Sequence, residues 1–488
     1  MGGSESKTTD LKHEIYFSDE EKAKVNHVFC SISHGKKSFN KENLQHFMTP
    51  VLDLPISGKL FELIDGPLPH QTHHHHHRLH AHQNHSQEVH LQHFASHLGQ
   101  LLKGSIADLA RTCVFLASSS QNSVSAQDLV KLVTSFLHSY EKLLSAHCTA
   151  YQSWIFADAF NSHDQLAVSL LKDLLKSGEA NSENSHHTGG VTLTEEAVEG
   201  WLNKCLLFSL IMKQVFHGAF QFYQQEPHQI TFLPRVPQVR DTNWSRFKTM
   251  LDFPTVLFLN FALNAELQSQ WKLVFSNSLH GNSFSQLLQH IRNKGPSFIV
   301  IKDKDGHVFG GFASVSWEIN PKFTGNSSCF LFKVKPFFQI YTSTGYNANF
   351  MYLNHQVQTL PNGLGMGGQF EYFGFWIDQS FDRGHSKAGA RGNTTFGSPQ
   401  LSAHTEFQVD CIEVWAVGRL ERKEEDEDDD EDTTDEAAKA GPRSILDKLA
   451  SEDKAILDFV DRGTKHDALR DEPIVEETKA HSTIISPF

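Results

Sequence analysis

The chain has 488 residues, 39% of them apolar and 20% charged, with a formal net charge of −14. This length provides for about three domains, each with a buried core. The charge is concentrated at one end, because residues 419–488 carry 11 Lys and Arg against 22 Asp and Glu, a balance of −11. The rest of the chain therefore holds only −3. No basic surface favours nucleic acid, and we expect no nucleic-acid partner.

The cysteines and the apolar runs indicate which cellular compartments are compatible with the sequence. Six cysteines are widely separated and form no C-x-x-C pair, which predicts a reducing compartment and argues against a disulfide framework or a zinc ribbon. The longest apolar run, "CLLFSLIM" at 205–212, is far too short to cross a bilayer. We therefore expect neither a transmembrane helix nor a secretory signal.

The first residues, "MGGSES", match the N-myristoylation pattern M-G-x-x-x-[ST], with Gly2 exposed once Met1 is removed and Ser6 in the required place. We expect lipidation of Gly2 in a segment that spans residues 1–16; the alternative is a flexible polar N-terminus. One myristoyl chain gives only marginal, reversible membrane attachment. A second contact, made by protein, is therefore expected.

Residues 17–224 have apolar residues at helical spacing and predict an all-helical region. Three short loops carry a single apolar residue ahead of a helix, as EF-hand loops do at position eight: Phe39, Val124 and Val191. Counting from Val191 puts Gly189 at position six and Glu195 at position twelve, but positions one, three and five hold no carboxylate. We expect an EF-hand-like scaffold that binds no calcium.

A histidine-rich tract interrupts this region. Twelve histidines lie between residues 70 and 97, and such tracts can bind transition metals. His93 and His97 also have the i, i+4 spacing of one helix face. The alternative is a low-complexity surface insertion at 70–97 without a defined site. We adopt this alternative and expect no metal site.

Residues 225–240 contain three prolines and predict a linker, after which the chain changes character. Residues 241–418 hold short β-rich runs separated by Gly, Asn and Pro turns: "TVLFLNFAL", "SFIVIKD", "HVFGGFAS", "CFLFKVKP", "FQIYTS", "FMYLN", "YFGFWID" and "FQVDCIEVWAVG". Two helices are expected at about 264–278 and 284–292. This pattern predicts a β-sandwich with flanking helices.

The stretch "FIVIKDKDGHVFGGFAS" at 298–314 contains Asp and Gly residues that suggest half of a calcium loop. With Gly306 at loop position six, positions one and twelve fall on Ile301 and Phe312, which cannot coordinate calcium. Two strands joined through Asp305 and Gly306 fit better, because Asp-Gly favours a type I′ hairpin turn. We predict a hairpin here.

Residues 241–418 also hold no common catalytic motif, neither G-x-S-x-G nor H-E-x-x-H. The glycine run "GLGMGG" at 363–368 could mimic a phosphate loop, but it lacks the Lys-Ser/Thr of a P-loop. Glycines in a strand-rich region more often permit tight turns and close approach of the backbone. We expect no catalytic residue and no cofactor.

Two cysteines and a glutamate are candidate reactive groups in this region. Alternation along one strand places Cys411 on the same face as Val409, Glu413 and Trp415, and Cys329 lies in "SSCFLF". Reactive thiols need a cationic, partly exposed setting, so both cysteines are expected to be inert. Glu413 is expected to accept structural hydrogen bonds; the alternative is a catalytic acid.

The C-terminal part begins with an acidic linker at 419–442, which includes nine consecutive acidic residues and is expected to be disordered. A helix is predicted at 443–463, before a disordered tail at 464–488. Four apolar residues fall near one face of this helix and are the candidate partner-binding residues: Ile445, Leu449, Ile456 and Val460. The helix either packs onto its own domain or enters a partner's groove.

At this point the sequence between about residues 241 and 418 resembles a TLDc domain. The shared anchors are "FGGFAS" with Trp317, Gly325 ahead of "CFLF", "TGYN" after Tyr341, "GLGMGG", "GFWID", "TFGSPQL" and "IEVWAVG". The resemblance implies a two-sheet sandwich that acts as an interaction module without an established catalytic site. It also implies links to oxidative-stress resistance and to binding of the peripheral part of the V-ATPase.

The glycine-led N-terminus, the degenerate EF-hand-like region and the C-terminal tail are similar to those of lysosome-associated, myristoylated family members that are associated with mTOR. The resemblance therefore implies an α+β protein that acts as a non-enzymatic adaptor. It would lie on the cytoplasmic face of the lysosomal membrane, attached through myristate, and in the cytoplasm. Its expected partners are V-ATPase peripheral subunits and mTOR pathway components. The alternative is a stress protein with thiol-based antioxidant activity.

Overall fold

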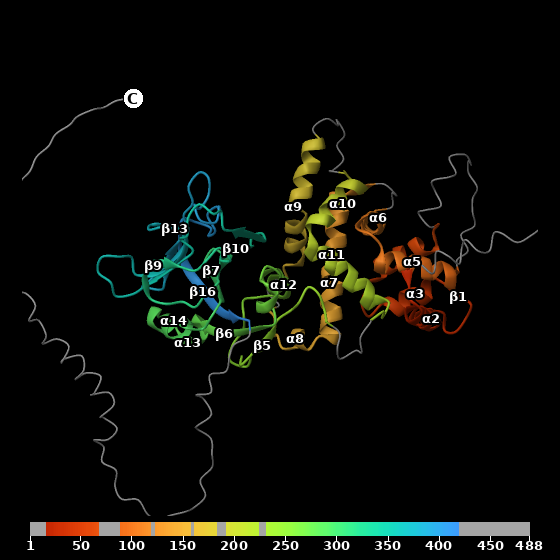
Figure 1. Ribbon diagram of the computed structural model, residues 1–488, viewed down its shortest axis with the longest axis horizontal. Helices are drawn as coiled ribbons and strands as arrows, with labels where there is room; N and C mark the ends of the chain where they lie inside the picture. Colours follow the sequence, from red (N-terminus) through yellow and green to blue (C-terminus); the bar gives the residue numbers. More distant parts are fainter. Residues whose placement is uncertain are drawn as a thin grey trace, which may run out of the picture. The chain divides into compact units, whose positions relative to one another are not determined.

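The computed structural model describes residues 16–67, 88–118, 123–157, 161–182, 192–223 and 231–418. Helices predominate up to Ala219 and strands predominate from Gln238 onward (Figure 1). This order confirms the predicted α+β class. Among the residues described, no helix is long and apolar enough to cross a bilayer.

Ten helices are described before residue 220: α2 Asp19–Ser33, α3 Lys41–Met48, α4 Leu54–Asp65, α5 Leu91–Lys103, α6 Ile106–Ala117, α7 Ala126–His147, α8 Thr149–Gln152, α9 His163–Ser182, α10 Glu195–Lys204 and α11 Leu206–Ala219. Polar N-caps explain several of their starts, because a side-chain oxygen accepts a hydrogen bond from an otherwise unpaired backbone N–H. Ser18, Asn40 and Ser105 each form a capping box. The capping residues thus determine where these helices begin.

Two short antiparallel ladders join the loops of this region in pairs, as in EF-hand pairs. The ladder between β1 (Ser38–Phe39) and β2 (Val89–His90) pairs Phe39 with Val89. The ladder between β3 (Ser123–Ser125) and β4 (Thr192–Thr194) pairs Val124 with Leu193. The EF-hand-like arrangement was therefore predicted correctly at Phe39 and Val124.

The third expected loop residue, Val191, lies outside the described residues, and Leu193 takes the paired, buried position opposite Val124. Taking Leu193 as position eight removes the expected match at position twelve, which moves from Glu195 to Ala197. Glu195 instead opens α10 and forms an ion pair of 3.3 Å with Arg111 of α6. Its carboxylate is therefore part of the packing between two helices.

The histidine-rich insertion is shorter than predicted. Residues 88–97 belong to the folded part, because β2 and the start of α5 lie there. His93 and His97 both donate from Nε2 to the carbonyl oxygen of Gly66, at 3.0 and 3.1 Å. Burial and the neighbouring His93 lower the pKa of His97 to about 4, so it stays neutral. This i, i+4 pair therefore fixes the end of α4 in place.

The predicted linker packs against the helices where it is described. Phe232 and Val236 are buried, and Tyr140 of α7 donates a hydrogen bond of 2.6 Å to the carbonyl of Pro234. Trp154 donates from its indole to the carbonyl of Pro237 at 2.8 Å. The segment thus connects the helical region firmly to the strands that follow.

The strands form two sheets joined by one long strand, β16 (Glu406–Val417). The first sheet has the order β11-β10-β8-β7-β16-β6-β5 and the second has the order β9-β12-β13-β14-β15-β16. Their bounds are β5 Gln238–Arg240, β6 Gln270–Ser276, β7 Ser297–Asp303, β8 Val308–Ala313, β9 Asn320–Thr324, β10 Phe330–Lys335, β11 Gln339–Thr342, β12 Met351–Asn354, β13 Gly363–Gln369, β14 Tyr372–Asp378 and β15 Arg383–His385. This is the two-sheet sandwich that was predicted.

Two secondary-structure predictions in this half were wrong. The run "TVLFLNFAL" forms α12 (Phe253–Phe261), which is capped by Asp252 and has Pro254 in its first turn. The helix expected over 264–278 is one short 3-10 turn at Ala265–Leu267, then β6, then α13 (Asn277–His280). The other expected helix is present as α14 (Phe284–Ile291). Both α13 and α14 lie beside β6 (Figure 1).

The hairpin between β7 and β8 is confirmed, but its turn differs from the prediction. A type I′ turn needs positive φ at both central residues, whereas only Gly306 has it here, at 88°. Its N–H donates to the carbonyl of Asp303, and the N–H of Asp303 donates to the carbonyl of His307. The loop is therefore a three-residue connection that ends on glycine.

Alternation along the strands divides the sandwich into three apolar clusters. One fills the space between the two sheets and includes Ile299, Leu331 and Met366. A second covers the other face of the first sheet and continues into the helical region; Trp154 packs against Trp415 there, with ring centroids 5.2 Å apart. The third lies on the outer face of the second sheet. The first sheet is thus covered on both faces.

Candidate interaction surface

All five residues predicted as functional sites lie outside the described residues. They are Gly2 at the N-terminus and Ile445, Leu449, Ile456 and Val460 in the C-terminal helix that the sequence predicts. Their roles stay predictions. The structure does provide a different candidate, on the outer face of the second sheet.

Five aromatic side chains form a shelf on that face, which we call the aromatic shelf: Phe323, Tyr352, Phe370, Phe373 and Trp376. The rings of Phe373 and Trp376 stack with centroids 4.6 Å apart, and Phe323 stacks on Phe370 at 5.6 Å. Phe370 and Tyr372 are 37% and 56% exposed, so the turn between β13 and β14 presents aromatic area to solvent. Exposed aromatic groups on a rigid sheet are typical of protein-binding surfaces.

The glycines of β13 provide the floor on which the shelf lies. A Cβ at Gly363 would lie 2.4 Å from the Trp376 ring, and one at Gly365 would lie 2.8 Å from it. The glycines therefore let the rings lie flat against the backbone. On the opposite face of the same strand, Leu364 and Met366 are buried between the sheets. The run "GLGMGG" is thus a strand with close backbone approach, as the sequence favoured over a phosphate loop.

A hollow of about 660 Å³ lies beside the shelf, and Phe373 and Trp376 form part of its wall. Its charged lining consists of four carboxylates and one guanidinium: Glu371, Asp378, Asp382, Glu406 and Arg383. Arg383 lies 3.7 Å from Asp382 and Lys387 lies 3.4 Å from Glu406, so two of the four acids are paired. A smaller acidic excess remains in the hollow, and it would favour a cationic segment.

His385 of β15 lies in the wall of the hollow beside Trp376, with ring centroids 6.2 Å apart. Burial, reinforced by the charge of Lys387, lowers the pKa of His385 to about 4. Its Nε2 is buried without a hydrogen-bond partner among the described residues. The ring is therefore neutral near pH 7 and adds no positive charge to the hollow.

Glu413 is fully buried and each of its carboxylate oxygens accepts hydrogen bonds. Oε2 accepts from the Thr249 hydroxyl at 2.7 Å and from the Trp415 indole at 2.9 Å, while Oε1 accepts from the Met250 N–H at 2.6 Å. Burial raises the pKa of Glu413 to about 7. The expected structural role is confirmed by these contacts, which join β16 to the segment before α12.

The two cysteines of the sandwich lie in different settings. Burial, together with Glu413 and Asp410, raises the pKa of the Cys411 thiol to about 12. Cys329 is buried and its sulfur lies 3.1 Å from the Ser314 hydroxyl. Neither setting is the cationic, exposed one that activates a thiol.

The prediction that Cys411 and Val409 lie on the same face of the strand was wrong. The register between β16 and β7 shifts between these two residues, which marks a β-bulge at Asp410. Val409 consequently packs against the cluster between the sheets, whereas Cys411 packs on the side of the helical region. The extra residue of the bulge moves the side chains before it to the opposite face.

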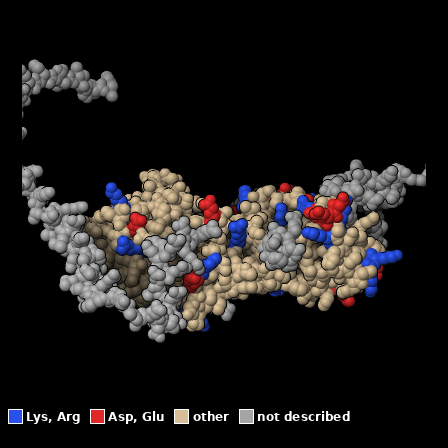
Figure 2. All heavy atoms as spheres, turned by 60° about the horizontal axis from the view of Figure 1, so that its bottom comes forward, with Lys and Arg blue, Asp and Glu red and all other residues tan. Residues whose placement is uncertain are grey.

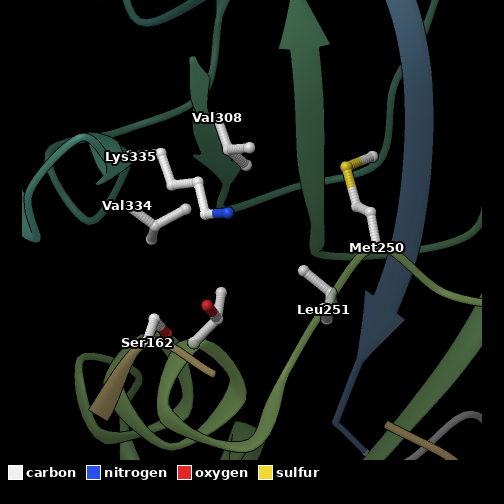
Figure 3. Close-up of a pocket in the computed structure, with 7 residues that line it drawn as sticks. Ser162, Met250, Leu251, Val308, Val334 and Lys335 are labelled. Atoms are coloured by element: carbon white, nitrogen blue, oxygen red, sulfur yellow. The ribbon is translucent and has the colours of Figure 1, made fainter. Parts of the chain in front are cut away.

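A small cavity lies where α12 and the segment before α9 meet the first sheet. Figure 3 shows the Lys335 side chain extending into it, with Ser162 below and Val308 and Val334 beside it. Its volume of about 10 Å³ suits roughly one water molecule. Burial lowers the pKa of Lys335 there. The space is far too small for a metabolite.

On the face drawn in Figure 2, basic and acidic side chains of the described residues are interspersed and form no broad patch of one sign. The acidic lining of the hollow is therefore a local feature of the surface. This distribution agrees with the near-neutral balance of the chain before residue 419.

The shelf was not predicted from the sequence. The available signals were the aromatic residues of "YFGFWID" and the glycine-rich strand "GLGMGG" that precedes them. Alternation alone does not tell which face is outside, since both faces of β14 carry large apolar residues. Only the pairing of β13 with β14 places Trp376 over the glycines.

Comparison with known proteins agrees with this architecture. Residues 245–418 match the TLDc domain family model. The chain is 35% identical to MTOR-associated protein MEAK7 of Gallus gallus over 399 residues, which are 80% of this chain and 81% of the relative. It is 33% identical to the protein of that name from Homo sapiens over 477 residues, 94% of this chain and 96% of the relative.

A second similarity covers a smaller share of the chain. Oxidation resistance protein 1 of Bos taurus is 33% identical over 147 residues, which are 30% of this chain and 16% of that protein. The matches at 33–35% identity, by contrast, cover most of both chains, helical region included. This protein therefore belongs to the family of TLDc-domain proteins that includes MTOR-associated protein MEAK7.

Proposed function

We propose that this protein is a non-enzymatic adaptor on the cytoplasmic face of the lysosomal membrane, where it supports mTOR signalling and binds the peripheral part of the V-ATPase. The observation that carries the proposal is the match to an mTOR-associated relative over 94% of the chain. The V-ATPase contact and the lysosomal location rest on what the TLDc resemblance implies.

The aromatic shelf and its acidic hollow give this adaptor a contact surface. Phe370 and Tyr372 would supply aromatic anchors, while the excess of carboxylates in the hollow would attract a basic segment of the partner. The helix predicted at 443–463 would add a second contact through its apolar face. Myristate on Gly2 would concentrate the protein at the membrane, since one acyl chain alone binds weakly.

Three observations support the non-enzymatic part of the proposal. Glu413 uses both carboxylate oxygens in buried hydrogen bonds, so it has no exposed proton to transfer. Cys411 has a pKa of about 12 and stays a thiol. The cavity at Ser162 holds about one water molecule.

The proposal is tested by pull-down from detergent-solubilised lysosomal membranes. The baits are the full-length chain, residues 1–442, Gly2→Ala, and the double variant Leu449→Asp with Ile456→Asp. We expect peripheral V-ATPase subunits on the full-length and Gly2→Ala baits and weak retention on the two tail variants. If no bait retains these subunits, the V-ATPase part of the proposal is wrong. Co-precipitation of mTOR with the full-length bait tests the proposed role in mTOR signalling.

The competing function is thiol-based antioxidant activity, which the similarity to oxidation resistance protein 1 keeps in view. Peroxide consumption by the purified protein would favour it if the activity were lost on changing Cys411 or Cys329 to serine. The high pKa of Cys411 argues against this outcome, because the thiolate is the nucleophile.

A further inference from the structure

A cluster of three potential metal ligands lies within the helical region. His138 and Glu141 lie about one turn apart on α7, and His163 is the first residue of α9. One ligand atom from each lies within 4.8 Å of the others. No other group of three or more His, Cys, Asp or Glu side chains in the described ranges meets this spacing.

The hydrogen bonds of His163 leave an electron pair aimed at a carboxylate. Its Nδ1 lies 2.5 Å from Oδ1 of Asn161, an oxygen that can only accept, so the ring hydrogen is on Nδ1. Nε2 lies 2.9 Å from Oε2 of Glu141, so a ring with its single hydrogen on Nδ1 would face the carboxylate with an electron pair. Two acceptors this close need a positive charge between them.

This contact is buried and its carboxylate is held in place. His163 is 5% exposed, and apart from the Glu141 contact its Nε2 makes no hydrogen bond to any described residue. The other oxygen of Glu141 accepts from the Tyr151 hydroxyl at 2.9 Å, which holds the carboxylate in position. Either a second proton on His163 or a metal cation would satisfy the facing electron pairs.

His138 favours the cation. Its ring stacks on that of His163 with centroids 3.9 Å apart, so a second imidazole lies at the same point. Ligand atoms of a tetrahedral zinc ion lie about 3.3 Å apart, given bond lengths of about 2.0–2.2 Å. Nε2 of His163 and Oε2 of Glu141 lie 2.9 Å apart and all three ligand atoms lie within 4.8 Å, so the cluster is close to that spacing.

We propose that His138, Glu141 and His163 form a binding site for a divalent transition-metal ion of the zinc class. Two imidazoles and one carboxylate are a ligand set that zinc uses, with the fourth position left to water or to another group. Asn161 and Tyr151 act as outer partners, because each holds one ligand in its binding orientation.

Such an ion would tie the start of α9 to α7. The residue before His163 is Ser162, whose N–H and hydroxyl both donate to Asp252, the N-cap of α12. The ring of His163 also lies 6.0 Å from that of Phe253. The site would therefore stiffen the helical region where it contacts the sandwich.

The test measures binding of Zn²⁺ and Co²⁺ to the purified full-length protein. Because the histidine-rich tract would bind these ions itself, the nine histidines between residues 70 and 85 are first changed to asparagine in every protein used. Competition with a chromophoric chelator gives the zinc affinity and stoichiometry, and visible absorption of Co²⁺ reports the ligand geometry. Thermal unfolding with and without Zn²⁺ is a second readout.

In this background we expect one tightly bound Zn²⁺ and a zinc-dependent rise in the midpoint of thermal unfolding. Glu141→Gln and His138→Asn should each weaken zinc binding by at least about 100-fold, since loss of an outer partner alone costs about 10- to 100-fold. Tyr151→Phe should fall within that smaller range. His147→Asn, on the exposed last turn of α7, is the matched control and should bind normally.

Binding that is equally strong in Glu141→Gln, His138→Asn and the control would place the ion elsewhere and overturn the proposal. So would the absence of stoichiometric binding at micromolar Zn²⁺ in the parent background, which would mean that a proton joins Glu141 to His163. If Glu141→Gln fails to fold, the half-buried His138→Asn decides the outcome.

Discussion

Replacing Glu413 by glutamine should remove a pH dependence of stability that this single buried group creates. Burial raises the pKa of Glu413 from its ordinary value of 4.5 to about 7, even though the hydrogen bonds from Met250, Thr249 and Trp415 lower it. The native state therefore holds the proton more tightly than the unfolded state does. Its contribution to stability is fully present below pH 4.5 and is lost as the pH rises through 7.

The size of the effect follows from that difference in pKa. At about 1.4 kcal/mol for each unit, the rise from 4.5 to about 7 corresponds to about 3 kcal/mol, most of it lost between about pH 5 and about pH 8. Glutamine cannot ionise. Between about pH 5 and about pH 8, the free energy of unfolding of Glu413→Gln should therefore fall by about 3 kcal/mol less than that of the wild type. The glutamine amide also places an N–H donor where the donors of Thr249, Met250 and Trp415 converge. This should lower the free energy of unfolding by about 1–3 kcal/mol at pH 5.

The assay is urea denaturation followed by tryptophan fluorescence at both pH values, for the wild type and Glu413→Gln. Other groups titrate in both proteins, so the quantity of interest is the difference between their two pH responses. Identical pH responses in wild type and variant would refute the reasoning and would mean that Glu413 is ionised in the native state throughout.

Three further predictions concern the sandwich. Gly310→Ala should destabilise the sandwich by more than ordinary overpacking, which costs about 1–3 kcal/mol, because the added Cβ would lie 1.9 Å from the Ile299 carbonyl oxygen. Urea denaturation measures the change in the free energy of unfolding, and a loss under about 1 kcal/mol would contradict the prediction. Tyr372→Asp, on the exposed turn that carries Phe370, should weaken V-ATPase pull-down without changing the thermal midpoint. Tyr346→Asp, 81% exposed on another loop, should leave the pull-down unchanged, and equal loss from both would argue against this surface. Cys411→Ser should leave any peroxide consumption unchanged, and a lost activity would revive the antioxidant alternative.

The fold was largely predictable because the strands carry strong local signals. Both strands of the hairpin around Gly306 are β-rich, and the turn glycine adopts the positive φ that its position requires. The prediction failed at α12, where β-branched and aromatic residues suggested a strand. There the cap at Asp252 and the proline in the first turn outweigh those propensities, and the helix buries both its faces.

The candidate surface and the metal cluster were not predictable, for a different reason. His163 is separated from His138 by 25 positions, and only the packing of α9 against α7 brings them together. The sequence instead drew attention to His93 and His97, whose spacing is regular but whose Nε2 atoms are both used on one carbonyl oxygen. Regular spacing shows which residues share a face, and tertiary packing decides what that face meets.

The two outer faces of the sandwich have different roles in this architecture. The helical region covers the outer face of the first sheet, where Trp154 lies among the aromatic rings of Trp271 and Trp415. Cutting the chain between the helical region and the sandwich would expose this apolar surface. The helical region therefore contributes to the stability of the sandwich. A partner that binds without unfolding the protein must therefore use a strand edge, a loop or the second sheet. Of these, the aromatic shelf combines exposed rings, a rigid glycine floor and a charged hollow, and this combination makes it the surface on which to test the adaptor proposal first.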